Sequence, residues 1–129
     1  MLFNKKPLIF IIPHHPFNTL PMKEIRAYIQ PYVLRDLLVQ LLETPGFTGV
    51  SVLDCTGIGT EKLATIHQFD PLFPRKRIEM IVPDELVDIM VAIIVRHAHT
   101  GNPNDGRIFI MDVQQSIQIS SYSTPPLKS

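Results

Sequence analysis

The 129-residue sequence has one cysteine, no tryptophan and no net charge. Because Cys55 has no second cysteine to pair with, an internal disulfide framework is excluded, and a reducing, cytoplasmic location is predicted. The 12 lysines and arginines equal the 12 aspartates and glutamates in number, so the basic footprint of a nucleic-acid-binding protein is missing. No apolar run approaches the length of a membrane span, so direct membrane insertion is not expected.

Recognised catalytic and metal-binding patterns are missing as well. The sequence has no paired acid and base at useful spacing, no nucleophile motif and no Walker loop, so we predict that the protein is not an enzyme. His97 and His99, like the other histidines and Cys55, show no zinc-ligand spacing. His97 near a helix end is explained by the helix dipole. We therefore predict no catalytic residue, no resident metal and no obligatory cofactor.

Hydrophobic residues make up 45% of the chain, enough for a core, and they follow two periods. Alternation that puts Ile25, Ala27 and Ile29 on one face predicts a strand at residues 23–30. Three further strands are predicted at residues 50–55, 76–82 and 108–113. Two helices are predicted, with core faces made of Leu34, Leu37, Leu38, Leu41 and Leu42 in the first, and of Leu86, Ile89, Met90, Ile93 and Ile94 in the second.

The predicted order β-α-β-β-α-β defines two split units of the α+β class. Right-handed crossovers place both helices on one face of a four-stranded antiparallel sheet. The other face, which carries Tyr28 and Phe109 or their neighbours, is left open. A partly apolar open face favours oligomerisation.

The domain boundaries are predicted from changes in composition along the chain. Residues 22–119 form the predicted domain, in which Ile117 and Ile119 are candidates for further strand pairing. Residues 120–129 are polar and contain proline, which is typical of a flexible tail. Residues 1–21 are an extension of the true start, an added strand or a disordered segment.

The stretch from Thr100 to Phe109 reads TGNPNDGRIF and joins the second predicted helix to the last predicted strand. A glycine-bearing turn that ends in a cation can hold an anionic phosphate. Glycines let backbone N–H groups converge, and an arginine adds charge and a planar fork. Asn-Asp-Gly is also what an ordinary tight connection needs. On the loop alone, the ordinary connection is the stronger interpretation.

Several segments resemble, in order, those of the PII signal-transduction proteins. They are residues 22–31 for the opening strand, 48–52 for the second strand, 57–59 for the start of the long T-loop, 74–79 and 82–88 for the return strand and second helix, and 100–109 for the B-loop. Together they span roughly residues 22–113, and several motifs in order are far more specific than any one. Pro45-Gly46-Phe47, Asp54-Cys55 and Lys76-Arg77-Ile78-Glu79 are similar to a divergent PII-like group associated with heavy-metal efflux.

The resemblance implies a ferredoxin-like homotrimer that binds ATP, ADP or AMP in clefts between subunits. It places Ser51 at the adenine, and Glu79 and the Ile81 backbone near the base and ribose. The implied phosphate-binding residues are Gly59, Asp105, Gly106 and Arg107, with Asn104 at the first glycine of the usual Gly-Asp-Gly. Arg75 replaces a lysine that reaches the 2-oxoglutarate site.

Departures from the PII pattern change the ligand that the resemblance implies. Asn104 replaces a glycine, but asparagine tolerates the left-handed conformation, so the turn can survive. Gln118 and Ser120 replace two arginines that clamp the β- and γ-phosphates, and each lost charge-assisted bond is worth about 1.5–3 kcal/mol. AMP or ADP is therefore favoured over ATP. Glu61 puts an acidic group beside the 2-oxoglutarate site and Thr60 replaces a basic one, so sensing of that dicarboxylate is not expected.

We predict a cytoplasmic regulator that binds an adenine nucleotide and controls a partner protein through the loop at residues 57–75. The suggested partner is a membrane transporter. Two alternatives stay open. A ligand-free trimeric interaction module is favoured by Gln118 and Ser120, and a metal-responsive regulator is suggested by the link of the divergent group to heavy-metal efflux.

Overall fold

The computed structural model describes residues 17–18, 21–57 and 73–123. The chain divides into two units, which are described separately. The larger unit is Pro21–Val113, and the segments before and after it, Met1–Leu20 and Gln114–Ser129, make up the other.

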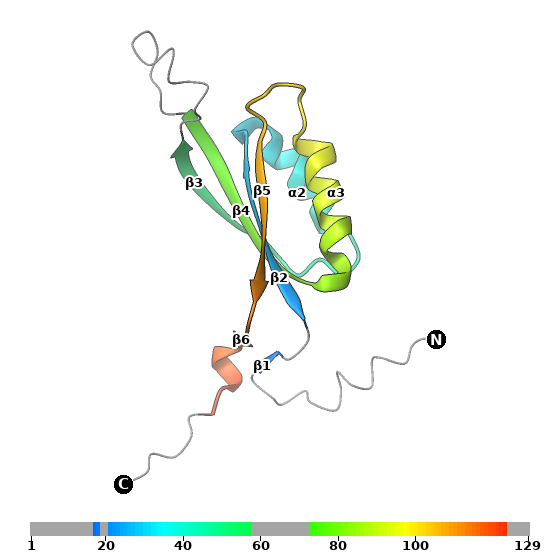
Figure 1. Ribbon diagram of the computed structural model, residues 1–129, viewed down its shortest axis with the longest axis vertical. Helices are drawn as coiled ribbons and strands as arrows, with labels where there is room; N and C mark the ends of the chain where they lie inside the picture. Colours follow the sequence, from blue (N-terminus) through cyan, green and yellow to red (C-terminus); the bar gives the residue numbers. More distant parts are fainter. Residues whose placement is uncertain (1–16, 19–20, 58–72, 124–129) are drawn as a thin grey trace. The chain divides into compact units, whose positions relative to one another are not determined.

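The larger unit contains one antiparallel sheet of four strands (Figure 1). The strands are β2 (Met22–Ile29), β3 (Ser51–Gly57), β4 (Phe73–Pro83) and β5 (Gly106–Val113), in the spatial order β3-β4-β2-β5. A 3₁₀ turn, η1 (Pro31–Val33), leads into helix α2 (Leu34–Leu42), and a second, η3 (Asp84–Leu86), leads into α3 (Val87–Ala98). Both helices lie on the same face of the sheet. The predicted ferredoxin-like α+β fold is confirmed.

The core lies between the helices and the covered face of the sheet. Strand β2 buries every second residue, Ile25, Ala27 and Ile29, as a half-buried strand must. The matching residues of β4 and the helices complete this core: Ile78, Met80, Val82, Leu37, Leu41, Met90 and Ile94. The predicted helix faces were too wide. Leu42 and Ile89 are exposed, because only a narrow stripe of each helix meets the sheet or its partner helix.

Strands β4 and β5 begin earlier than predicted, and both extensions affect the candidate site. Strand β4 begins at Phe73 because it pairs with β3 as far as Gly57. Strand β5 begins at Gly106, which lies opposite Ile29 of β2. Gly106 and Arg107 are therefore strand residues, and the loop between α3 and β5 ends at Asp105.

In the smaller unit, strand β1 (Phe17–Asn18) pairs antiparallel with β6 (Ser116–Ile117). A short 3₁₀ turn, η4 (Ile119–Ser121), follows. The prediction of further strand pairing is right for Ile117 and wrong for Ile119, which lies in η4 and is 92% exposed. Among the helices that the structure describes, none has the length and apolar character to cross a membrane.

Candidate functional site

Two glycines set the path of the loop between α3 and β5. Gly101 has φ +92° and Gly106 has φ +124°, a region that other residues rarely adopt. Asparagine can tolerate a left-handed conformation, but Asn104 does not adopt one, since no non-glycine residue in the described part of the chain has positive φ. The positive φ angles lie at Gly101 and Gly106, near the two ends of the loop, so the turn does not require a positive φ at Asn104.

Gly106 is also required by a close approach between strands. A Cβ atom at this position would lie 1.8 Å from the backbone oxygen of Tyr28 on β2. That separation is far inside van der Waals contact, so the loop can enter β5 along this path only without a side chain at residue 106.

Asp105 holds the loop closed through its carboxylate. Oδ2 accepts hydrogen bonds from the backbone N–H of Thr100 at 2.6 Å and of Gly101 at 3.1 Å, and Oδ1 accepts one from the Thr100 hydroxyl. The bond from the Thr100 hydroxyl is the main cause of a lowered pKa of Asp105. The two backbone bonds and nearby His99 act in the same direction, against partial desolvation. The carboxylate therefore stays ionised.

The lowered pKa predicts an acid-sensitive contribution to stability. Because the folded-state pKa of Asp105 is below its unfolded value, its ionised form stabilises the fold above the unfolded pKa. That stabilisation is lost as the pH falls through the folded pKa. We expect the difference in free energy of unfolding between the wild type and Asp105→Asn to be constant above about pH 5 and to shrink below it. Urea titrations at several pH values would measure it, and a difference that grows toward acid would contradict it.

A second contact ties the loop to the end of β2. The side-chain amide of Gln30 donates a hydrogen bond to the backbone oxygen of Asn104 at 2.8 Å. Below the loop, a cavity of about 380 Å³ has an apolar floor that includes Ile29, Ile94 and Ile108, and Asp105 and Arg107 line it too. An apolar floor with charged groups at its margin is the usual character of a small-molecule site.

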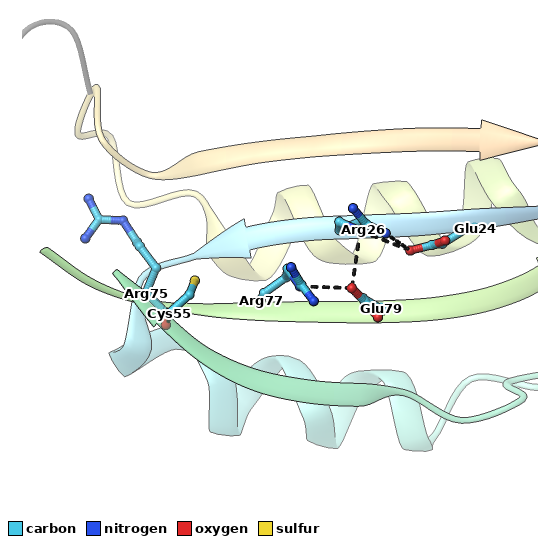
Figure 2. Close-up of polar contacts among 6 residues, drawn as sticks. All are labelled: Glu24, Arg26, Cys55, Arg75, Arg77 and Glu79. Atoms are coloured by element: carbon cyan, nitrogen blue, oxygen red, sulfur yellow. Dashed lines mark hydrogen bonds and ion pairs between the residues drawn. The ribbon is translucent and has the colours of Figure 1, made fainter. Parts of the chain in front are cut away.

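The open face of the sheet carries a row of polar side chains that includes two predicted site residues. Ser51 lies opposite Glu79, Glu79 opposite Arg26, and Arg26 opposite Phe109 across the four strands. Figure 2 shows the carboxylate of Glu79 between two guanidinium groups. Its Oε2 lies 3.2 Å from Arg26 Nε and 2.9 Å from Arg77 Nε.

The same ion network continues along β2 to Glu24. Arg26 donates from Nε to Glu24 Oε2 at 3.0 Å, and its NH2 group lies 2.9 Å from the same oxygen. Arg77 Nε is buried but is not aligned to hydrogen-bond Glu79, and it has no other hydrogen-bond partner among the described residues. Glu79 is thus held by two cations of its own chain.

The remaining predicted residues near β3 and β4 have contacts of their own. The hydroxyl of Thr48 donates to the backbone oxygen of Ile81 at 2.6 Å, so this carbonyl already has a partner. Arg75 donates to the Pro74 oxygen at 2.8 Å and lies over the ring of Phe73, and Figure 2 shows its guanidinium pointing away from Glu79. Gly59 lies outside the described residues.

The predicted site residues fall into two groups on opposite halves of the sheet. Ser51, Glu79 and Ile81 lie on β3 and β4, whereas residues 104–107 span the end of the loop and the start of β5. Three strand spacings, about 14 Å, separate β3 from β5, and two spacings, about 10 Å, separate β4 from β5. One chain does not bring the two groups together.

Several contributors were not predicted from the sequence. Thr100 and Gln30 hold the loop, and Arg26 and Arg77 hold Glu79. The alternation of β2 and β4 could have placed both arginines on the face of Glu79. In the part of the chain that the structure describes, no three His, Cys, Asp or Glu side chains gather into a metal-binding group.

The fold places this chain among small α+β domains of the ferredoxin-like class. The family model of nitrogen regulatory protein P-II matches residues 22–122. Nitrogen regulatory protein P-II 1 of Escherichia coli K12 is 39% identical over 103 residues, which cover 76% of this chain and 91% of that protein. Nitrogen regulatory protein P-II of Rhodobacter capsulatus is 35% identical over 108 residues, covering 80% and 96%.

A solved structure gives the same result. The crystal structure of Arabidopsis thaliana PII bound to citrate superimposes with a TM-score of 0.64 at 25% identity, covering 78% of this chain and 85% of that one. The chain belongs to the nitrogen regulatory protein P-II family. It is a signal-transduction regulator and not an enzyme, as the sequence predicted.

Proposed function

We propose that this chain binds an adenine nucleotide, AMP or ADP in preference to ATP, in clefts between the subunits of a homotrimer. The observation that carries the proposal is the separation of the two residue groups, one on β3 and β4 and the other at the β5 edge of the same sheet. If the β3 edge of one copy adjoins the β5 edge of another, Ser51 and Glu79 meet Gly106 and Arg107 in a shared cleft. The base would lie against the first group and the phosphate against the second.

The open sheet face supports assembly of several copies. Phe109 is 45% exposed and stacks edge-to-face on Tyr28 with ring centroids 6.2 Å apart. Leu53 and Ile81 are exposed on the same face, around the network of Arg26 and Glu79. An exposed apolar surface of this kind is stabilised when a second copy covers it.

The charges near the loop support a ligand with few phosphates. Arg107 is exposed, and it directly follows Gly106, the first residue of β5. Gln118 and Ser120 add no cation where two arginines occur in the PII pattern. With fewer charge-assisted bonds to offer, the cleft suits one or two phosphates better than three.

The long loop between β3 and β4 is the proposed means of control. Its ends are paired, Gly57 opposite Phe73, so the loop leaves and re-enters the sheet at one point. Nucleotide contacts at Gly59 would favour one conformation of the loop between β3 and β4, and that conformation would bind the partner. Gly57 and residues 73–75, which were predicted as part of this loop, are paired strand residues. We propose a membrane transporter as the partner and the cytoplasm as the location.

Removal of the Arg107 guanidinium tests the phosphate site. We expect Arg107→Ala to weaken ADP binding by about 10- to 150-fold, the equivalent of one charge-assisted bond of 1.5–3 kcal/mol. Calorimetry with AMP, ADP and ATP measures this effect. Arg35→Ala, which removes an exposed arginine of α2, is the matched control and should bind as the wild type does.

Native mass spectrometry of the wild type completes the test. A trimer that carries nucleotide supports the proposal. A trimer that binds none of the three nucleotides would refute it and would favour the ligand-free interaction module, whereas a monomer would remove the shared cleft altogether.

A further inference from the structure

The most heavily hydrogen-bonded pair in the described loop is Thr100 and Asp105. The loop runs from the end of α3 at Ala98 to the start of β5 at Gly106. Within it, the Asp105 carboxylate accepts from two backbone N–H groups and from the Thr100 hydroxyl. The Thr100 oxygen accepts in turn from the backbone of Asn102 at 3.4 Å and from its side-chain amide at 3.1 Å.

These bonds decide which part of the loop can meet an anion. Successive N–H groups that converge form an anion-binding nest, and here the anion is the loop's own carboxylate. The N–H groups of Thr100 and Gly101 are therefore already occupied by Asp105. This nest therefore holds the loop closed and cannot bind the ligand phosphate. The groups that remain available to a phosphate are at the other end of the loop, at Gly106 and Arg107.

We propose that Thr100 is a positioning residue for nucleotide binding, because its hydroxyl and Asp105 clamp the loop in the conformation that presents Arg107 to a phosphate. This inference rests on the proposed nucleotide site. Arg107 follows Asp105 by two residues, so a change in the direction of the loop at Asp105 is passed to it directly. A clamped loop loses little conformational freedom on binding, whereas an open loop must be ordered at the expense of affinity.

The clamp can be opened without removing any group assigned to the ligand. Thr100→Val keeps the shape of the side chain and removes the hydroxyl, and Thr100→Ser keeps the hydroxyl. Thr44→Val is the matched control, because the Thr44 hydroxyl donates to the Gln40 oxygen at 2.8 Å at the end of α2. We expect Thr100→Val to weaken ADP binding about tenfold, and Thr100→Ser and Thr44→Val to bind within about twofold of the wild type.

Amide hydrogen exchange separates positioning from a general loss of stability. In the protein without nucleotide, Thr100→Val should speed exchange at Gly101 while core amides of β2 exchange as in the wild type. Unchanged ADP affinity in Thr100→Val would overturn the inference, as would equal weakening in Thr44→Val.

The clamp and the proposed function can fail separately. If the wild type binds no nucleotide, the proposed function is refuted, and with it the role of Thr100 in binding. Exchange at Gly101 then still tests the clamp: faster exchange in Thr100→Val supports it as a loop-holding device, and unchanged exchange refutes that as well.

Discussion

Replacement of Gly106 by alanine is expected to lower the free energy of unfolding by more than about 3 kcal/mol. A residue with a Cβ atom at φ +124° carries a conformational cost of about 1–2 kcal/mol. The new Cβ would in addition lie 1.8 Å from the Tyr28 oxygen, so β5 must move away from β2 where the two strands first pair. Urea denaturation measures the loss, and ADP binding should fall with it because Arg107 is displaced.

Gly49→Ala is the matched control for this prediction. Gly49 has φ +114°, but an added Cβ would meet nothing within 4 Å. This variant therefore carries the conformational cost alone, about 1–2 kcal/mol. If the two variants were equally stable, the close approach to Tyr28 would contribute nothing.

The requirement for Gly106 shows how the loop and the sheet depend on each other. The sequence explains a glycine at this position either by an ordinary tight connection or by backbone N–H groups that converge on a phosphate. The structure adds a second requirement, because any side chain here would separate the edge strand β5 from its pairing partner β2. The same residue thus serves strand pairing and the candidate anion site.

Much of the fold follows from periodicity in the sequence. Alternation in β2 placed Ile25, Ala27 and Ile29 correctly in the core, and helical spacing placed Leu37 and Met90 there too. Periodicity could not say how wide a stripe of each helix the sheet would cover. The width depends on how the elements pack, which no local pattern contains.

The candidate site was less predictable, for physical reasons. The loop could be predicted as a candidate phosphate site because its glycines permit unusual backbone angles and the arginine at its end supplies a positive charge. Both properties are local and can be recognised in the sequence. The clamp between Thr100 and Asp105 depends on how the loop folds back on itself, and the pairing of Arg77 with Glu79 depends on side-chain direction. Spacing alone also did not reveal that the predicted residues lie on opposite halves of the sheet.

Leu41→Ala is expected to cost about 2–5 kcal/mol of unfolding free energy, the range for removing a buried leucine side chain. Leu41 is 0% exposed and belongs to the core between helix α2 and the sheet. Alanine would leave a cavity that the packed β-strands cannot collapse to fill. Its neighbour Leu42 is 69% exposed on the same helix, so Leu42→Ala should stay within about 0.5 kcal/mol of the wild type.

The pair Leu41→Ala and Leu42→Ala differs in burial alone, since residue type, helix and position are nearly the same. Urea unfolding of both variants therefore tests the covered stripe of α2 directly. If Leu42→Ala were as destabilising as Leu41→Ala, α2 would be covered on both sides, as the wide apolar face in the sequence suggested. Dilution of the protein until its copies dissociate would show what covers Leu42. If the destabilisation by Leu42→Ala is then lost, a second copy covers the side chain. If it persists, the chain itself covers it.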